Sequence, residues 1–327
     1  MSRFTILITG GCGFLGSHLA EYFLKSGHSV IAVDNFCTGS AANLKFLRGL
    51  STAENSFHFV EADVCSPWAA WIKALPSEVV KNTKMVFHMA SPASPPHYQA
   101  LGLETLWANS LGLKNALEFA DSVGARLVFA STSEIYGDPL VNPQPESYRG
   151  NVNTVGPRAC YDEAKRFGEA LMYTHNRKWN TTHGIVRIFN TYGPRMNPQD
   201  GRVVINFLVQ AHEGSALTIY GSGQQTRSFC YVDDLRDALV EFGKATGEFG
   251  PVNIGNPNEF TVRQLAEAVV RLFPNKNLPL EFRELPVDDP TQRRPDISRA
   301  LSLLNWSPKI QLEEGLRRTY EWLADAL

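Results

Sequence analysis

Three glycines spaced three residues apart, Gly10, Gly13 and Gly16, separate an apolar run from an amphipathic stretch. The run Phe4–Thr9 has the length and composition of a buried strand, and Gly16–Ser26 has helical spacing. At such a junction Gly10 permits a tight turn, Gly13 lets a pyrophosphate approach the backbone, and Gly16 lets helix and strand pack closely. The amides at the start of the helix attract phosphate. The sequence therefore predicts a dinucleotide site at this turn.

The first half of the chain alternates short apolar runs with amphipathic stretches. Runs rich in β-branched or apolar residues are predicted as buried strands, and stretches with helical spacing are predicted as helices. The strands are Phe4–Thr9, Ser29–Asp34, Phe57–Glu61, Met85–Met89 and Arg126–Ser131, and the helices are Gly16–Ser26, Thr105–Ser122 and Cys160–Trp179. Because each parallel crossover needs a covering helix, this alternation predicts an α/β fold with a Rossmann-type, doubly wound parallel sheet.

Turn-forming residues become frequent after about residue 188. We therefore expect a Rossmann domain over residues 1–187 and a smaller, mainly substrate-binding lobe over residues 188–327. Such a lobe would cover the carboxyl ends of the strands, where open α/β sheets hold their ligands. The segments Phe229–Leu239 and Pro251–Ile254 have the pattern of a return to the main sheet. Residues from about 228 to 256 are therefore expected to rejoin the first domain.

Composition narrows the class of protein. The chain has 327 residues, of which 43% are hydrophobic and 20% charged, with a formal net charge of -2. This near-neutral balance gives no electrostatic reason to bind nucleic acid or a membrane surface, so neither is expected as a partner. The five scattered cysteines lack zinc-ligand and disulfide spacing, so we expect no metal and reduced thiols in the cytoplasm. The strand starting at Phe4 leaves no room for a signal peptide, and no apolar run is long enough to cross a bilayer.

Asp34 ends the second predicted strand, where its carboxylate can accept hydrogen bonds from the hydroxyls of an adenosine ribose. The same charge would repel a 2′-phosphate, so NAD rather than NADP is the expected cofactor. Asp63 and Val64 follow the third predicted strand, where an adenine contact would fall. A helix-capping aspartate explains Asp63 equally well, and both interpretations stay open.

A tyrosine and a lysine lie one helical turn apart in Tyr161-Asp-Glu-Ala-Lys165. The lysine charge, with a nicotinamide cation nearby, is expected to lower the pKa of the phenol so that a tyrosinate takes a hydroxyl proton. Ser131-Thr-Ser-Glu134 ends the fifth predicted strand, where hydroxyls and a carboxylate would face a sugar. A surface pair would explain the tyrosine and lysine alone, but it leaves their combination with the glycine motif unexplained.

Together these features resemble the extended short-chain dehydrogenase/reductase family, the NAD-dependent epimerases and dehydratases, over essentially the whole chain. Within that family the chain is most similar to the UDP-glucuronate decarboxylases, or UDP-xylose synthases. The stretches that carry the resemblance are Ala90-Ser-Pro-Ala-Ser-Pro-Pro, Ala130-Ser-Thr-Ser-Glu-Ile-Tyr-Gly-Asp-Pro, Gly156-Pro-Arg-Ala-Cys-Tyr-Asp-Glu, Arg187-Ile-Phe-Asn-Thr-Tyr-Gly-Pro-Arg-Met, Asp200-Gly-Arg-Val-Val and Gln225-Thr-Arg-Ser-Phe.

Two details favour a decarboxylase among these relatives. Dehydratases usually carry Asp-Glu after the strand-end threonine and epimerases usually lack the glutamate, whereas this chain has Ser133-Glu134 after Thr132. The segment Asp288-Asp-Pro-Thr-Gln-Arg293-Arg-Pro-Asp-Ile matches the one that supplies the active-site arginine of the decarboxylases. The resemblance gives that role to Arg293, with Arg294 as its neighbour, and a solvated basic loop is the alternative.

The resemblance implies that Tyr161, with Thr132 and Lys165, deprotonates the C4 hydroxyl of UDP-glucuronate while NAD takes the C4 hydride. The 4-keto intermediate then loses carbon dioxide, assisted by Arg293 and Glu134, and the NADH is reused to give UDP-xylose. The implied NAD-binding residues are Gly10, Gly13, Phe14, Leu15, Gly16, Asp34, Asn35, Thr38, Asp63, Val64, Met89, Ser91, Ala130, Tyr161, Lys165, Thr191 and Arg202. The implied substrate-binding residues are Ser133, Glu134, Asn190, Arg202, Tyr220, Arg227 and Arg293. Tyr220 and Tyr231 are candidate ring contacts, but ordinary packing is the favoured explanation for both.

The chain departs from the family at one helix, where the common Thr-Leu-Lys-Thr is replaced by Thr105-Leu-Trp107-Ala108. A tolerated swap at a helix surface is one reading, and a shifted substrate or release of the 4-keto product is the other. The exact sugar nucleotide and the fate of the NADH therefore stay open. A nucleotide-sugar 4,6-dehydratase or 4-epimerase is the alternative activity, and a non-catalytic NAD-sensing protein is a further one.

The family also implies a homodimer, in which the helices Thr105–Ser122 and Cys160–Trp179 pair across a two-fold axis. Both helices carry apolar residues on more than one face, namely Leu111, Leu117, Phe167 and Leu171. Burial within one chain explains the same pattern, so the homodimer is an expectation from the resemblance.

Overall fold

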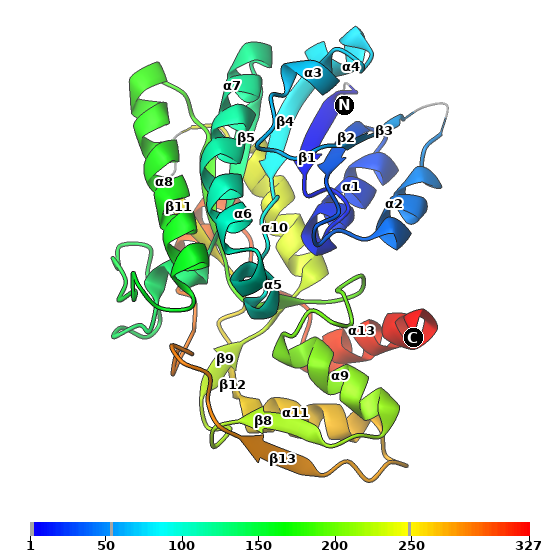
Figure 1. Ribbon diagram of the computed structural model, residues 1–327, viewed down its shortest axis with the longest axis vertical. Helices are drawn as coiled ribbons and strands as arrows, with labels where there is room; N and C mark the ends of the chain where they lie inside the picture. Colours follow the sequence, from blue (N-terminus) through cyan, green and yellow to red (C-terminus); the bar gives the residue numbers. More distant parts are fainter. Residues whose placement is uncertain (1–2, 53–54, 248–249) are drawn as a thin grey trace.

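The computed structural model describes residues 3–52, 55–247 and 250–327, and a seven-stranded sheet lies at its centre (Figure 1). All strand pairs in this sheet are parallel, and the order is β11-β6-β5-β4-β1-β2-β3. The strands are β1 (Thr5–Thr9), β2 (Ser29–Asp34), β3 (Phe57–Glu61), β4 (Thr83–His88), β5 (Arg126–Thr132), β6 (Gly184–Ile188) and β11 (Pro251–Ile254). The predicted Rossmann-type fold is confirmed, since continuous apolar runs belong to strands covered on both faces.

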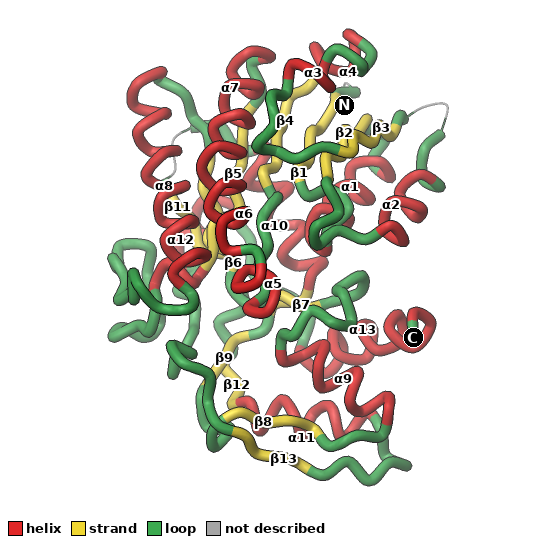
Figure 2. Tube along the Cα trace, viewed as in Figure 1, coloured by secondary structure: helices red, strands yellow, loops and turns green. Residues whose placement is uncertain are grey.

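Helices cover both faces of this sheet, as the alternation of elements requires (Figure 2). One face is buried against α1 (Phe14–Lys25), α10 (Val232–Lys244) and α12 (Ser298–Leu304), with Phe23 and Phe242 in the shared core. The other is buried against α7 (Leu113–Val123) and α8 (Ala159–Trp179). The remaining short helical segments of this region are α2 (Ala41–Arg48), α3 (Ala69–Ile72), α4 (Ser77–Lys81), α5 (Pro95–Ala100), α6 (Gly102–Trp107) and a 3-10 turn (Ser133–Tyr136).

The predicted helix Thr105–Ser122 is wrong as a continuous α-helix. It is divided into α6, a π-helical segment Ala108–Gly112, and α7. Side chains in this region take carbonyls that regular helical bonds would use: Asn109 Nδ2 donates to Thr105 O at 2.8 Å, and His88 Nε2 lies 3.0 Å from Ala108 O. Insertions of this kind often mark functional sites.

The chain after β6 builds a second apolar core beneath the sheet (lower part of Figure 1). Its helices are α9 (Val203–Glu213), α11 (Val262–Leu272) and α13 (Leu312–Ala326). Its strands form two small sheets, β8 (Leu217–Tyr220) with β13 (Leu280–Arg283), and β9 (Thr226–Ser228) with β12 (Glu259–Thr261). Leu208, Leu265 and Leu316 from the three helices are fully buried together.

The two segments expected to rejoin the main sheet behave differently. Pro251–Ile254 is β11, which pairs in parallel with β6 at the edge of the sheet. Phe229–Leu239 contributes no strand to that sheet but returns to it through a helix, because Leu235, Ala238 and Leu239 of α10 pack in the core on one face of the sheet. Its residues form β10 (Cys230–Tyr231), which pairs with β7 (Thr191–Tyr192), and then the start of α10, because the apolar residues after Tyr231 recur with helical rather than alternating spacing.

The carboxyl ends of the strands meet at one edge of the main sheet. Parallel register aligns Thr9 of β1 with Val33 of β2 and with His88 of β4, and it pairs Thr132 of β5 with Ile188 of the adjacent strand β6. The glycine turn after β1, Asp34 at the end of β2 and the Ser/Thr segment at the end of β5 therefore face the same region. Among the described residues, no helix combines the length and apolarity needed to span a bilayer.

Candidate active site

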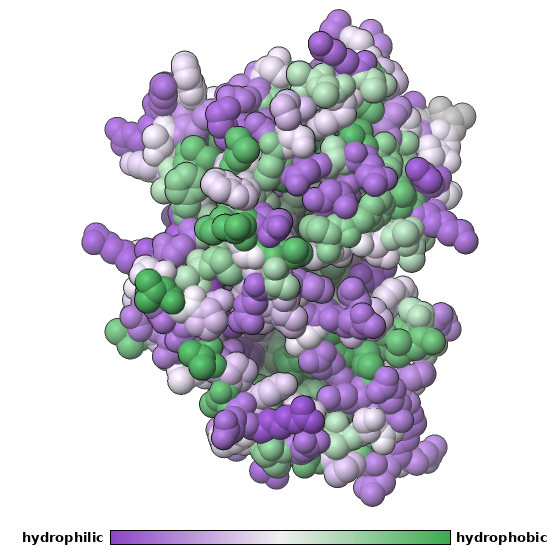
Figure 3. Space-filling model, in the orientation of Figure 1, coloured by the Kyte–Doolittle hydropathy of each residue, from purple (hydrophilic) through white to green (hydrophobic). Residues whose placement is uncertain are grey.

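A cavity of about 1410 Å³ opens between the carboxyl edge of the sheet and the α9 region, where the surface in Figure 3 is hollowed. Every site residue expected from the sequence lines this cavity, including the glycine turn, Asp34, Tyr161, Lys165 and Arg293. Tyr231 is outside the lining set and is 3% exposed in the core, so the packing interpretation holds for it. Tyr220 lines the cavity and is 40% exposed.

The glycine turn has the geometry of a backbone cradle. Gly10 adopts φ 65°, which a residue with a side chain rarely adopts. A Cβ on Gly16 would lie 2.1 Å from Gly10 O, so Gly16 is needed to close the turn on itself. Gly16 therefore lets the start of α1 approach the end of β1 closely, as the sequence predicts. Gly11 makes a second close approach, because its Cβ would lie 2.6 Å from that of Ala32 in β2.

Asp34 is held firmly at the end of β2. Its Oδ2 accepts a hydrogen bond from Cys12 N and its Oδ1 one from Phe36 N, each at 2.9 Å. Burial raises the pKa of Asp34, while these backbone bonds favour the charged form. A Cβ on Gly39 would lie 2.5 Å from Oδ1, so the loop passes directly over the carboxylate. The cradle and this fixed acceptor fit a dinucleotide with free ribose hydroxyls.

Asp63 and Val64 line the same cavity after β3. Asp63 Oδ1 accepts a hydrogen bond from Cys65 N at 2.8 Å and so caps a tight turn. The next helix, α3, begins only at Ala69, so the helix-capping interpretation of Asp63 is wrong. Val64 is 6% exposed and packs beside Gly112 of the π-helical segment.

Tyr161 and Lys165 project from the first turns of α8 into the cavity. Lys165 Nζ donates to Ala130 O at 2.7 Å and lies 5.7 Å from the centre of the Tyr161 ring. Burial lowers the pKa of Lys165 to about 7. Burial also raises the pKa of Tyr161 to about 12, although a hydrogen bond with Thr132 opposes it. The sequence predicts a lowered phenol pKa from Lys165 acting together with a nicotinamide cation, and that stays a prediction; in the protein alone, desolvation of the phenol outweighs the neighbouring groups.

The Tyr161 ring is fixed by a partner that sequence reasoning missed. Tyr98 of α5 stacks on it with ring centres 4.9 Å apart and planes 5° from parallel. Tyr98 is 1% exposed, and its own ring faces the guanidinium of Arg158 at 5.9 Å. Only an aromatic residue just after Ala90-Ser-Pro-Ala-Ser-Pro-Pro hinted at this contact in the sequence.

Glu134 lies between two guanidinium groups. Arg293 Nη1 and Nη2 donate to its two oxygens at 2.6 and 2.8 Å, and Arg158 Nη2 donates to Oε2 at 2.5 Å. Burial alone would raise the pKa of Glu134, but Arg158 and Arg293 lower it to about 2. Arg293 is 4% exposed, so the solvated-loop alternative is wrong for it. Sequence reasoning quoted the motif holding Arg158 but gave this residue no role, since its partner is remote in the chain.

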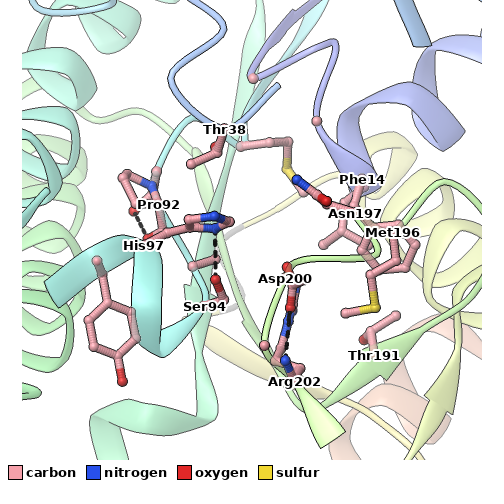
Figure 4. A pocket seen from close by; sticks show the side chains of 18 of the residues that line it. Phe14, Thr38, Pro92, Ser94, His97, Thr191, Met196, Asn197, Asp200 and Arg202 are labelled. Carbon is pink, nitrogen blue, oxygen red and sulfur yellow. Dashed lines mark hydrogen bonds and ion pairs between the residues drawn. The ribbon is translucent and has the colours of Figure 1, made fainter. Parts of the chain in front are cut away.

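Further arginines line the part of the cavity towards α9. Figure 4 shows Asp200 and Arg202 facing Ser94 and His97 across the cavity, with Arg202 Nε and Nη2 donating to Asp200 at 2.5 and 2.8 Å. Arg227, at 7% exposure, donates through Nη2 to Asp289 at 2.9 Å. Ser133 and Asn190 lie on the same wall. These side chains form a polar region next to Tyr161 and Lys165.

Trp107 ends α6 and lines the cavity together with Glu104 and Leu111 of the same helical stretch. It is 56% exposed, so the indole lies at the rim of the cavity. Ala108 is buried and is the first residue of the π-helical segment. The departure from the family pattern therefore falls on the cavity wall itself.

Asp121, His175 and His183 form a cluster of metal-ligand types at the opposite edge of the sheet. His183 Nδ1 accepts a hydrogen bond from Leu127 N at 3.0 Å, so its Nε2 carries the proton and donates to Asp121 Oδ1 at 3.0 Å. A protonated ring nitrogen has no lone pair for a cation. The cluster is thus explained as a hydrogen-bonded link between α7, α8 and β6.

Comparisons with known proteins agree with this geometry. A UDP-glucuronic acid decarboxylase of Arabidopsis thaliana is 46% identical over 312 residues, covering 95% of this chain and 86% of the relative. A UDP-glucuronic acid decarboxylase of Danio rerio is 45% identical over 99% of this chain and 74% of its own length.

The crystal structure of UDP-glucuronic acid 4-epimerase from Bacillus cereus, in complex with UDP-glucuronic acid and NAD, is similar with a TM-score of 0.84 and 25% identity. The similarity covers 99% of this chain and 100% of the Bacillus cereus chain. The model of the NAD dependent epimerase/dehydratase family matches residues 6–255. The chain is therefore an enzyme, and it belongs to the NAD dependent epimerase/dehydratase family.

Proposed function

We propose that this protein converts UDP-glucuronate to UDP-xylose by decarboxylation through a 4-keto intermediate, with the NADH reused inside each cycle. The observation that carries the proposal is the arrangement of Tyr161 and Lys165 in the same cavity as the Glu134–Arg293 pair. Oxidation of a sugar hydroxyl does not itself require a buried guanidinium group. A buried arginine such as Arg293 is explained if the site also binds an anionic group of the substrate. The relatives at 45–46% identity are named for this decarboxylation.

The NAD-binding residues of the proposal are those that line the cavity from the glycine turn to Lys165. Gly10, Gly13 and Gly16 with the start of α1 would hold the pyrophosphate, and Asp34 the adenosine ribose. The remaining contacts are assigned to Phe14, Leu15, Asn35, Thr38, Asp63, Val64, Met89, Ser91, Ala130, Tyr161, Lys165, Thr191 and Arg202. When bound, NAD takes a hydride from the sugar C4 and later gives it back.

In the proposed reaction Tyr161 Oη receives the proton of the C4 hydroxyl, with Thr132 as its hydrogen-bond partner. Oxidation at C4 makes the C5 carboxylate that of a β-keto acid, whose C5–carboxyl bond breaks to give carbon dioxide and an enolate. Arg293 offers its buried Nε, which has no hydrogen-bond partner among the described residues, while its Nη groups hold Glu134. C5 then takes up a proton, and Tyr161 returns its proton to the C4 oxygen as the ketone is reduced.

The substrate grip is proposed along the same wall. Ser133 and Glu134 would meet the sugar, and Arg202 and Arg227 the diphosphate, because a guanidinium fork matches phosphate oxygens. Asn190 and Tyr220 complete this set at the cavity lining.

Replacing Tyr161 by Phe tests the proposal. The variant is expected to release carbon dioxide from UDP-glucuronate at less than about a hundredth of the wild-type rate, since a general base contributes about 10²–10⁴-fold. Tyr173→Phe, an exposed position on the same helix, serves as the matched control. Trapped carbon dioxide and UDP-xylose are measured together. A Tyr161→Phe protein that works at the full rate would show that the assigned base is wrong.

A 4-epimerase is the second candidate, because the similar Bacillus cereus protein that was solved with UDP-glucuronic acid and NAD is a UDP-glucuronic acid 4-epimerase. The same incubation separates the two activities. Conversion of UDP-glucuronate without carbon dioxide would favour epimerisation, whereas gas release favours decarboxylation. No turnover of any UDP-sugar would favour the NAD-sensing alternative.

We also propose that the protein is a cytoplasmic homodimer. In this dimer the stretch from α6 to α7 and helix α8 of one subunit pack against the same helices of the other subunit across a two-fold axis. Leu103, Leu106, Leu111 and Phe167 are exposed on these helices, and hydrophobic residues gather over α6 in Figure 3. Leu117 is buried within the chain and Leu171 is partly buried in the same core, so these two do not support an interface. Light scattering on Phe167→Glu is expected to show a monomer where the wild type shows a dimer.

The division of the chain follows from the two cores. We propose residues 1–187 as the NAD-binding domain, rejoined by about 228–256, and residues 188–327 mainly as the substrate-binding lobe. The support is that α10 and β11 pack with the main sheet, while α9, α11 and α13 share the second core.

A further inference from the structure

The arginines that line the polar wall of the cavity are all engaged by carboxylates. Arg293 and Arg158 share Glu134, Arg202 is held by Asp200, and Arg227 is held by Asp289. These four guanidinium groups and three carboxylates leave a single net positive charge along the wall. The proposed substrate carries a carboxylate and two phosphates, so it brings at least three negative charges. The anionic groups of such a ligand would therefore compete with these carboxylates for the arginines.

Of the three carboxylates, Asp289 accepts the fewest hydrogen bonds and is the most exposed. Its Oδ2 accepts one hydrogen bond, from Arg227 Nη2 at 2.9 Å, and its side chain is 27% exposed. Asp200, by contrast, is 9% exposed, binds Arg202 through two nitrogens, and also accepts from Arg202 N at 3.3 Å. Glu134 is fixed by three hydrogen bonds from two arginines.

Arg227 keeps its orientation without Asp289. Its Nη1 donates to Thr226 O at 2.8 Å and its Nη2 to Pro290 O at 2.6 Å. Its side chain is 8% exposed, so packing also holds it. Loss of the Asp289 contact would therefore leave a guanidinium that is already placed and directed at the cavity.

A second cation is in reach of Asp289. Its Oδ1 lies 3.9 Å from Arg158 Nη1, a nitrogen group different from the Nη2 that binds Glu134. The chain on either side is anchored to the loop between β5 and α8, by Asp288 to Asn153 at 3.0 Å and by Thr291 to Asp138 at 2.9 and 3.0 Å. Asp289 thus lies within ion-pair distance of both arginines, at 2.9 Å from Arg227 and 3.9 Å from Arg158.

We propose that Asp289 is a counter-ion that occupies the place of the substrate diphosphate on Arg227 and turns to Arg158 when the diphosphate arrives. This inference rests on the proposed function, because it takes the ligand to be a nucleoside diphosphate ester. It links the two ends of the substrate site. Phosphate binding at Arg227 strengthens the anchoring of Arg158, which in turn holds Glu134 beside the sugar. Asp289 is thus a positioning residue that also sets the affinity for the nucleotide.

The exchange makes a prediction with a definite sign. In Asp289→Asn the competing charge is gone, so UDP is expected to bind about 1.4- to 5-fold more tightly, the range that follows from removing one partly exposed ion pair. Uridine has no phosphate, so its affinity is expected to be unchanged. If Asp289 instead only fixed the orientation of the Arg227 side chain, Asp289→Asn would weaken UDP binding.

Calorimetric titration of the full-length protein with UDP and with uridine tests this. Asp288→Asn is the matched control, because Asp288 lies in the same loop, bonds to Asn153 and is outside the cavity lining. Its UDP affinity should equal that of the wild type. Weaker or unchanged UDP binding by Asp289→Asn, or an equal gain for uridine, would overturn the exchange while leaving the decarboxylase proposal standing. Failure of the wild type to bind UDP at all would overturn both.

Discussion

Replacing Arg158 by Gln tests whether two guanidinium groups are needed to align Glu134. The Arg158 Nη2–Glu134 Oε2 contact is 2.5 Å, and the two side chains are 10% and 13% exposed. Loss of such a charge-assisted bond costs about 1.5–3 kcal/mol. If that energy is expressed in the transition state, kcat falls about 10- to 150-fold, because about 1.4 kcal/mol corresponds to a factor of ten.

The charge of Glu134 would survive this change. The same 1.5–3 kcal/mol corresponds to a rise of about one to two pKa units. Starting from a pKa of about 2, Glu134 would remain ionised at pH 7.5, with the bidentate Arg293 contact still in place. The expected loss is therefore one of orientation. A lower kcat with the same pH profile is its signature.

The assay is carbon dioxide release from UDP-glucuronate between pH 5.5 and 9. Arg158→Gln is expected to lower kcat across this range without a new acid limb, and to change KM by less than about threefold. Arg177→Gln, at the far end of α8, is the control on the same helix and should keep the wild-type rate. An Arg158→Gln protein within twofold of wild type, or one with a new protonation step above pH 5.5, would refute the alignment argument.

Other changes have equally definite outcomes. Gly16→Ala would place a Cβ 2.1 Å from Gly10 O, so it should lower the free energy of unfolding by about 1–3 kcal/mol and weaken NAD binding in a fluorescence titration, whereas intact binding would contradict the cradle. Burial raises the pKa of Asp162 to about 7, above its unfolded value, so this group costs stability as pH rises from about 4 to about 7. Asp162→Asn should therefore raise the melting temperature at pH 8 and leave it unchanged at pH 4, and an equal shift at both would rule out the titration. Trp107→Lys adds a cation to the cavity rim and should lower the KM for UDP-glucuronate about 3- to 10-fold, and an unchanged KM would mean that the rim does not meet the ligand.

The parts of the fold that local pattern controls were predictable. The strands that became β1, β2, β3 and β5 were assigned to within one residue at each end, because a parallel sheet buried on both faces needs continuous apolar runs. The glycine turn could also be predicted from the sequence, since Gly10 needs a positive φ that few other residues tolerate. The site residues on these elements all reached the cavity because parallel strands bring their carboxyl ends to one edge.

What the sequence did not reveal depends on partners distant in the chain. The π-helical segment at Ala108–Gly112 arises where Asn109 and His88 compete for carbonyls, and His88 comes from a separate strand. Arg158 acquires its role from Glu134, which lies 24 residues away, and Tyr98 from its stacking on Tyr161. No periodicity records such pairings. They become visible only when the sheet has placed the loops.

The resting protonation states suggest why the site needs two ligands before it reacts. Burial holds Tyr161 at a pKa of about 12 and Lys165 at about 7, so at neutral pH the phenol keeps its proton and the lysine is only partly charged. Neither state suits proton abstraction from a sugar hydroxyl. A positive charge beside the phenol would stabilise the phenolate, and the nicotinamide ring of bound NAD carries such a charge. Because Glu134 raises the pKa of Tyr161 while Arg202 lowers it, the arginines and carboxylates along the wall also contribute to the pKa of this phenol.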